Sequence, residues 1–251
     1  MSEGFRLRVK YRITGRLAYL SHLETVRSME RVVRRAVLPF AITEGFNPHM
    51  KIAFGPALPV GAGSRSEYFD VRLRSYVAPD EALAALQAAA PENLMPVECA
   101  YRAHGDDAID VMYPVSVWRA ELVCERASVD DVARAFGQLV DRGFIEVTKT
   151  KGRKTTAKRV EFAGRLVDGP HVVDNGDAVT VGFSTFQGNE GALRPDKFIA
   201  AACELMGDQV TVRSLTRMEL REAQFPLFSS SRVGHDSQRV LWRCTERSEI
   251  K

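Results

Sequence analysis

Residues 20–61 read LSHLETVRSMERVVRRAVLPFAITEGFNPHMKIAFGPALPVG, and this stretch decides how the N-terminal part of the chain folds. Ser21 stands three residues before Glu24, which is the spacing of a capping box, in which each side chain bonds a backbone N–H at a helix start. Pro39 cannot continue a helix, because its nitrogen carries no hydrogen. The stretch therefore predicts a helix over residues 22–37, followed by a turn-rich loop.

The two sides of this predicted helix differ in chemistry. Apolar residues recur at helical spacing, and we expect them to form the buried stripe. They are Val26, Met29, Val33 and Val37. The other side carries Arg27, Arg31, Arg34 and Arg35. Guanidinium groups bond phosphate oxygens in pairs, so this face is a candidate for binding an RNA backbone; the alternative is a solvated face paired with Glu24 and Glu30.

The loop after the helix combines an aromatic ring, an amide, an imidazole and an ammonium group within six residues. It can present Phe46 for base stacking and Asn47 or His49 for hydrogen bonds, as proteins that recognise single-stranded RNA do. The alternative is a structural turn in which Phe46 belongs to the core. The candidate residues of the loop are Gly45, Phe46, Asn47, Pro48, His49 and Lys51.

Alternating hydrophobicity predicts the strands around this helix. Residues 5–14 read FRLRVKYRIT, so we expect a half-buried strand with its Arg and Lys side chains pointing outward. The order β-α-β-β-α-β that results is that of a ferredoxin-like unit, which packs two helices on one face of a four-stranded antiparallel sheet. The other predicted elements are strands over 51–54, 67–73 and 95–102 and a helix over 79–90.

The second half is predicted to repeat this plan, which makes the chain an α+β protein of two tandem ferredoxin-like domains with antiparallel sheets. The domains span residues 1–104 and 111–222, and a polar C-terminal tail, residues 223–251, follows them. The predicted elements are strands over 115–124, 144–148, 160–167, 178–183 and 210–220 and helices over 128–141 and 195–206.

A basic segment in the second half is another candidate for an anionic partner. Residues 144–165 contain seven Lys or Arg against two Glu, a local balance of +5. An RNA would relieve the repulsion among these charges, and a solvated loop is the alternative. The residues assigned to RNA binding here are Lys149, Lys151, Arg153, Lys154, Lys158 and Arg159.

Composition narrows the class of protein. The chain has 251 residues, of which 45% are hydrophobic and 27% charged, as in ordinary globular proteins. Its apolar runs are shorter than the roughly 18 residues of a membrane helix, and its first residues lack the apolar core of a signal peptide, so we expect a cytoplasmic protein without a membrane partner. The cysteines stand too far apart for a zinc ribbon or an iron–sulfur cluster, and we expect isolated buried thiols at Cys99, Cys124, Cys203 and Cys244.

Five short motifs together resemble the radical-SAM-linked domain family, whose function is not established. They are LSHLE at 20–24, MERVVRRA at 29–36, GFNPH at 45–49, PVG at 59–61 and EYFD at 67–70, and a looser likeness extends to about Glu222. Members are fused to, or associated with, a cobalamin-type radical SAM enzyme. The resemblance implies such a partner enzyme, which would carry the iron–sulfur cluster and S-adenosylmethionine, with no cofactor bound by this chain. The chain departs from the family pattern at Ile13, Glu24 and Met50, where Lys, Asp and Pro are expected.

Catalysis by this chain is a weaker interpretation. His22 and His49 could approach one another and act as general base and acid in metal-free RNA cleavage. A metal site from these histidines and Glu24 has only residue type in its favour, and we predict no metal. The chain contains no glycine-rich phosphate loop, no GxSxG turn and no HExxH motif.

We therefore expect a non-catalytic adaptor that binds RNA, in tRNA or rRNA modification, for a radical SAM enzyme. There are two alternatives: a metal-free endoribonuclease, and a purely protein-binding module whose loop docks the partner enzyme. No oligomeric state is predicted. The residues assigned to ligand or partner binding are Ser21, His22, Glu24, Gly45, Phe46, Asn47, Pro48, His49 and Lys51.

Overall fold

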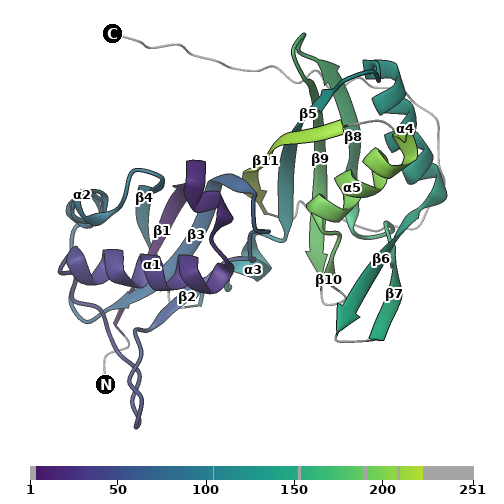
Figure 1. Cartoon of the computed structure of the whole chain (residues 1–251). Coiled ribbons are helices and arrows are strands. Elements are labelled where there is room, and N and C mark those ends of the chain that lie inside the picture. Colours follow the sequence, from purple (N-terminus) through teal and green to yellow (C-terminus); the bar gives the residue numbers. More distant parts are fainter. Residues whose placement is uncertain (1–3, 104, 152–153, 189–190, 208–209, 223–251) are drawn as a thin grey trace.

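The computed structural model describes residues 4–103, 105–151, 154–188, 191–207 and 210–222. This part of the chain is a mixed α+β protein with five α-helices and one large, mostly antiparallel sheet of nine strands. Figure 1 shows the two halves of the chain side by side, each with its own helices. Within the described residues, no helix is both long and apolar enough to cross a membrane.

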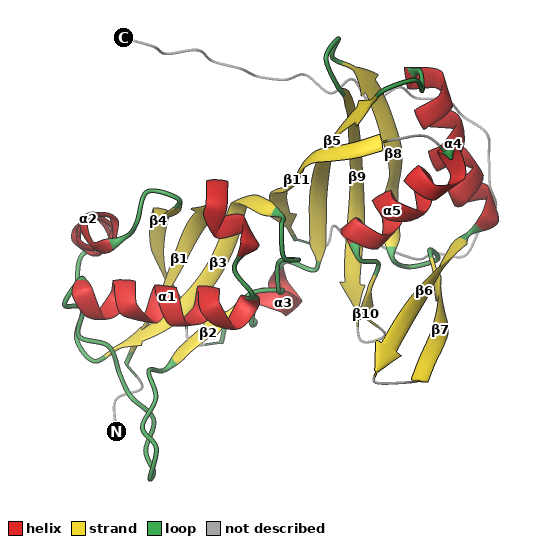
Figure 2. Ribbon diagram, viewed as in Figure 1, coloured by secondary structure: helices red, strands yellow, loops and turns green. Residues whose placement is uncertain are grey.

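The first half buries one face of its strands beneath two helices. Leu7 and Val9 are fully buried on that face, where Met29 of the first helix and Leu86 of the second pack against them. Figure 2 shows both helices on the same side of the strands. The elements are β1 (Phe5–Ile13), the 3-10 helix η1 (Gly15–Tyr19), α1 (His22–Arg35), β2 (Ile52–Phe54), β3 (Gly63–Leu73), α2 (Pro79–Ala89) and β4 (Leu94–Arg102).

The second half builds a separate core in which aromatic rings meet. The ring of Phe198 lies 5.4 Å from that of Phe136 and 5.1 Å from that of Phe183, in edge-to-face contacts. The elements are α3 (Ile109–Met112), β5 (Val115–Cys124), α4 (Val129–Arg142), β6 (Phe144–Lys151), β7 (Lys154–Glu161), β8 (Leu166–Asp174), β9 (Val179–Gly188), β10 (Gly191–Ala192), α5 (Pro195–Met206) and β11 (Val210–Arg221).

The strands of the two halves form one sheet. Its order is β10-β9-β5-β11-β3-β1-β4, with β2 paired to β3 and β8 paired to β9, while β6 and β7 form a separate hairpin. The halves are joined where β11 runs parallel to β3, at the pairs Thr216–Gly63 and Arg217–Ser64. The sequence predicted one sheet for each half, and this short parallel contact merges them.

The junction of the halves encloses a buried ion pair. Arg217 of β11 donates from Nη1 to both carboxylate oxygens of Glu67 on β3, at 2.8 and 2.9 Å. The same guanidinium donates to the carbonyl oxygens of Pro56 (3.0 Å) and Ala57 (3.2 Å) and lies 4.7 Å from the centre of the Trp118 ring. The side chains of Arg217 and Glu67 are only 3% and 5% exposed, so this pair ties the two halves together in a site that water barely reaches.

The start of α1 is as predicted and its end is not. Ser21 and Glu24 form the capping box, but the helix ends at Arg35. Val37, predicted to be buried, is 84% exposed and has a φ of +54°, a left-handed conformation that β-branched residues rarely adopt. Pro39 disfavours helical geometry at Leu38, the residue after Val37, so the helix cannot continue past this turn. Thr25 and Val32 are buried in addition to the predicted Met29 and Val33.

Other predicted boundaries also shift. The strand predicted over 160–167 is wrong, because β7 ends at Glu161 and a turn precedes β8. The turn closes by hydrogen bonds from the N–H groups of Arg165 and Leu166 to the carbonyl oxygen of Phe162, and Gly164 supplies its positive φ of +69°. The predicted tail, residues 223–251, and Cys244 within it lie outside the described residues. Three thiols predicted to be buried are instead half-buried, at Cys99, Cys124 and Cys203.

Candidate nucleic-acid interface

The GFNPH motif forms the end of a narrow loop that projects from the first half, at the lower left of Figure 1. Ile42 and Met50 pair across its base, and Met50 is buried, which anchors the loop in the core. Thr43 and His49 exchange two further hydrogen bonds, of 2.7 and 2.9 Å. Phe46 is 106% exposed, so it is not the core residue of the structural-turn interpretation. The base of the loop is therefore ordered while its aromatic side chain faces solvent.

Four cationic residues lie next to the base of this loop. The Arg34 guanidinium of α1 lies 5.2 Å from the centre of the Phe40 ring, and Arg35 ends the same helix. On the other side, Lys51 donates its backbone N–H to the strand that enters the loop, and Arg74 donates its own to Pro39. The loop thus carries an exposed ring, and cationic residues adjoin its base; sites for single-stranded RNA combine aromatic rings with positive charge.

The other predicted arginines of α1 are exposed on the side of the helix away from the sheet. Arg31 donates to Ser28 Oγ at 3.2 Å, and Arg27 is close enough to Glu24 for its charge to help lower the pKa of that carboxyl. The larger causes of that lowered pKa are the side-chain and backbone hydrogen bonds from Ser21. Glu24 and Ser21 therefore act in starting the helix, which accounts for these two predicted site residues without a ligand.

The structure does not bring the two predicted catalytic histidines together. His22 begins α1, and its ring lies nearly perpendicular to that of Phe54, with centroids 6.2 Å apart. His49 follows the other end of α1, which is about 20 Å long at 1.5 Å per residue. Among the described residues, no group of three or more His, Cys, Asp or Glu could hold a metal ion. A histidine pair for RNA cleavage is thus not formed in this conformation.

A cluster of cations that sequence reasoning did not assign to the site lies on the helix-free face of the first-half strands. Alternate residues of a strand point to opposite faces, so Arg6 and Arg8 of β1 lie opposite the α1 side. The pairing register places Arg72 and Asp70 of β3 directly beside them, and Arg102 of β4 beside Arg6. The alternation in FRLRVKYRIT was the available signal, but the register that collects the other charges could not be read from it.

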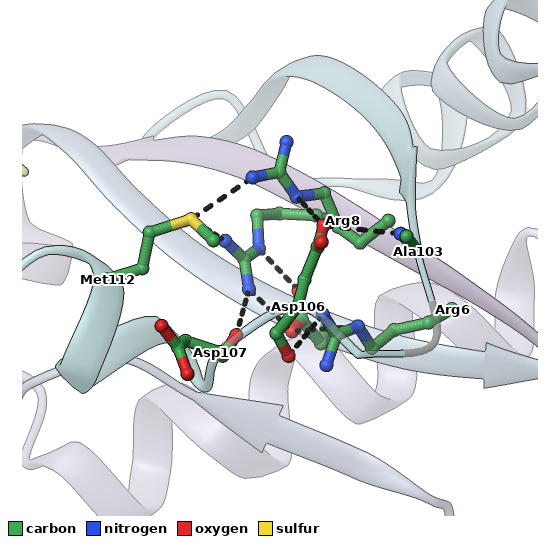
Figure 3. Close-up of polar contacts among 8 residues, drawn as sticks. Arg6, Arg8, Ala103, Asp106, Asp107 and Met112 are labelled. Atoms are coloured by element: carbon green, nitrogen blue, oxygen red, sulfur yellow. Dashed lines mark hydrogen bonds and ion pairs between the residues drawn. The ribbon is translucent and has the colours of Figure 1, made fainter.

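The segment that links the halves, residues 105–112, is held on this face by arginines, as Figure 3 shows. Arg8 makes a two-point ion pair with Asp70, at 2.7 and 2.9 Å, and donates to Met112 Sδ at 2.9 Å. Arg6 donates to the carbonyl oxygen of Asp106 at 2.9 Å. The bond to Asp70 raises the pKa of Arg8, which is only 4% exposed. Arg8 is therefore a structural cation that fixes the linking segment.

A groove of about 600 Å³ opens beside this cluster, between β2, the linking segment and β9. Arg6, Lys51 and Arg72 line it together with Asp70, whose charge Arg8 balances. Its further lining includes the backbone turn after β2, apolar side chains and two polar side chains; these residues are Ala53, Gly55, Pro56, Ala57, Ile109, Asp110 and Gln187. The first half thus has an exposed loop at one end and a cationic groove on the face away from its helices.

Residues 6–195 match a family model described as an uncharacterized protein conserved in bacteria, DUF2344. The chain belongs to the DUF2344 family. The DUF2344 match includes α1, the projecting loop, the groove and the β6–β7 hairpin. A search of curated proteins gave no match.

Two solved structures are distantly similar to this DUF2344 chain. A crystal structure of a Cbf5-Nop10-Gar1 complex aligns with 87% of the chain at 9% identity and a TM-score of 0.47. The alignment covers 49% of that protein, so the chain spans about half its length. A putative dyp-type peroxidase protein from Shewanella oneidensis aligns with 86% of the chain and covers 91% of its own, at 8% identity and a TM-score of 0.21. Neither likeness assigns a fold or a function.

The basic segment of the second half forms the β6–β7 hairpin. At its base, the guanidinium groups of Arg142 and Arg159 lie 4.3 and 3.5 Å from the centre of the Phe144 ring, and Arg159 also pairs with Glu161. Arg159 is therefore held by its own hairpin, while Lys158 is exposed. The rest of the predicted RNA-binding set lies outside the described residues: Arg153, and the side chains of Lys149, Lys151 and Lys154.

Proposed function

We propose that this protein binds single-stranded RNA through the projecting loop of residues 43–49. The observation that carries the proposal is the full exposure of Phe46 on a loop whose base is fixed by hydrogen bonds and by buried Met50. Exposing an aromatic side chain to water is unfavourable, and a partner that covers it removes this cost. Any of the four nucleobases can stack on the ring, so such binding does not depend on the RNA sequence. Asn47 and His49 add hydrogen-bonding groups on the same loop.

The charges around the loop favour RNA over a neutral partner. Arg34, Arg35, Lys51 and Arg74 flank its base, and among the described residues these four side chains form no ion pair with a carboxylate. Each phosphate that such a cation neutralises lowers the logarithm of the affinity by about 0.7 per tenfold rise in salt for single strands. A protein partner bound through Phe46 alone would show a much smaller salt dependence.

The proposal includes an accessory role. The chain would present RNA to a radical SAM enzyme in tRNA or rRNA modification, and that enzyme would supply the iron–sulfur cluster and S-adenosylmethionine. Support comes from the motifs at residues 20–24 and 45–49, which resemble proteins associated with such enzymes. The separation of His22 from His49 also favours an accessory protein over the endoribonuclease alternative.

We also propose that the two halves are two ferredoxin-like units. In the first, the order β1-α1-β2-β3-α2-β4 gives a sheet order of β2-β3-β1-β4 with antiparallel neighbours. In the second, the order β5-α4-β8-β9-α5-β11 gives a sheet order of β8-β9-β5-β11, again antiparallel. The β6–β7 hairpin is then an insertion between α4 and β8, which explains how the second unit departs from the first.

Fluorescence anisotropy with labelled single-stranded RNA tests the proposal. Phe46→Ala should weaken binding by about 5- to 150-fold, because stacking of one base on an aromatic ring contributes about 1–3 kcal/mol. Tyr19→Ala is the matched control, since Tyr19 is also an exposed aromatic (72%) but lies on η1, away from the loop. Wild-type binding that is absent, or equally weakened in both variants, would overturn the RNA proposal and leave docking of a protein as the role of the loop.

A further inference from the structure

The groove on the helix-free face differs in chemistry along its length. One row of cations crosses the sheet, formed by Lys51 directly before β2, Arg72 of β3 and Arg6 of β1. Arg72 pairs with Arg6 and donates its N–H to the carbonyl oxygen of Lys51. Gly55 lies four residues further along the chain, about 13 Å away at 3.3 Å per residue. There, the turn of Gly55 approaches Ile109 of the linking segment so closely that a Cβ on Gly55 would lie 2.9 Å from Ile109 Cγ2. One end of the groove is therefore cationic and the other apolar.

The cationic end has capacity for an anion. Lys51 is exposed, and its ammonium group has no partner among the described residues. Arg6 donates one hydrogen bond, from Nη2 to the carbonyl oxygen of Asp106. Its Nε lies 3.8 Å from an Asp70 carboxylate oxygen and makes no hydrogen bond within the described residues. The carboxylate of Asp70 already accepts two bonds from Arg8. The net charge that faces a ligand at this end is positive.

The other end suits a flat, mostly apolar group. Pro56, Ala57 and Ile109 supply apolar surface, and Ala53, between the two ends, lines the groove with only a methyl group. Asp110 and Gln187 add hydrogen-bonding groups to the lining. A volume of about 600 Å³ is in the range of pockets that enclose small ligands, about 300–1,000 Å³. A phosphate joined to a heterocycle has this distribution of charge and apolar surface.

We propose that the groove binds one nucleotide of the RNA, with its phosphate at Arg6, Lys51 and Arg72 and its base against the apolar end. This inference rests on the proposed function, because it identifies the ligand as part of an RNA chain. The projecting loop lies close to the cationic end, since only Met50 separates Lys51 from the GFNPH motif. One strand of RNA can therefore contact Phe46 and continue into the groove.

Isothermal titration calorimetry on the full chain tests the site with simple probes: each 5′-nucleoside monophosphate, the matching nucleosides and inorganic phosphate. The monophosphates should bind saturably, and nucleosides and phosphate more weakly. Lys51→Gln should lower monophosphate affinity about 10- to 150-fold, as expected for one charge-assisted hydrogen bond. Ala53→Phe should fill the groove and abolish binding while leaving every cation in place. Arg12→Gln removes an exposed charge from β1 outside the groove and should change nothing.

The outcomes separate this inference from the proposed function. Inorganic phosphate that binds as tightly as the monophosphates, or Ala53→Phe that binds them normally, would overturn a nucleotide site. RNA binding that depends on Phe46 but is unchanged in Ala53→Phe would overturn the groove as an RNA site and leave the role of the loop intact. Monophosphate binding without any RNA binding would overturn both the RNA proposal and the assignment of the nucleotide to an RNA chain.

Discussion

Replacing Arg217 with methionine should strongly destabilise the protein, because the ion pair at the junction of the halves would lose one partner. Arg217 donates to both oxygens of Glu67 and to the carbonyl oxygens of Pro56 and Ala57. Methionine fills much of the same space but donates no hydrogen bond. The Glu67 carboxylate, 5% exposed, would then be buried without a counter-charge.

The expected loss is about 3–5 kcal/mol, the usual effect of removing one member of a buried ion pair. It is large against the total stability of a domain, about 5–15 kcal/mol. Adding Glu67→Met to Arg217→Met should restore at least about 2 kcal/mol, because the double variant buries no charge. The recovery stays incomplete, since the carbonyl groups of Pro56 and Ala57 still lack their donor.

Urea unfolding followed by circular dichroism measures both effects, and Arg213→Met is the control on the same strand. Arg213 pairs with Asp177 at 2.7 Å, but these side chains are 44% and 76% exposed, so its loss should change stability by less than about 1 kcal/mol. If Arg217→Met were no more destabilising than Arg213→Met, or if the double variant were no more stable than Arg217→Met alone, the buried pair would not hold the junction.

Three further predictions concern single positions. Val37→Gly should stabilise the protein by about 1 kcal/mol in urea unfolding, because glycine adopts the φ of +54° without strain and the exposed valine packs little. Hydrogen bonds from the backbone and hydroxyl of Ser128, and then from Arg134, lower the pKa of Asp131 to about 2. The stability that this carboxylate contributes is therefore present above its unfolded-state pKa of about 3.9 and disappears as the pH falls toward 2. Asp131→Asn should abolish that part of the pH dependence of stability. Burial, and then the charge of Glu98, raise the pKa of the Cys99 thiol to about 12. Iodoacetamide at pH 8 should therefore leave Cys99 unmodified in the folded protein and modify it in urea. Mass spectrometry of the peptide that contains Cys99 measures the modification.

Local signals in the sequence were enough to predict most of the individual elements. The capping box at Ser21 marks the start of α1, the helix predicted over 128–141 is α4 shifted by one residue, and the helix predicted over 195–206 is α5 without change. Boundaries were missed where a local turn competes with hydrophobic alternation, as at Gly164, or where the chain enters a strained turn, as at Val37. Both are decided by backbone conformation, which hydrophobic patterns do not report.

The joining of the two sheets could not be predicted, because it depends on two residue pairs between β3 and β11 that lie about 150 positions apart in the chain. The candidate site divides in the same way. The exposed GFNPH loop was predicted from local composition, whereas the groove depends on the register that places Arg6 beside Arg72 and on the linking segment that closes over them. His22 lies at the start of α1 and His49 follows its other end, a separation that residue type alone could not indicate.

The junction ion pair also bears on the groove, through the two carbonyl groups that Arg217 holds. Pro56 and Ala57 line the apolar end of the groove, and the Arg217 fork reaches both of them as well as Glu67. Arg217→Lys keeps the charge but not the planar fork, so one ammonium group cannot serve the carboxylate and both carbonyls. We expect a smaller loss of stability than in Arg217→Met, about 1–2 kcal/mol, together with weaker nucleoside monophosphate binding, although Arg217 does not line the groove. Calorimetry and urea unfolding on the same samples measure the two effects. Unchanged nucleotide affinity in a destabilised Arg217→Lys variant would show that the junction joins the halves without setting the shape of the groove.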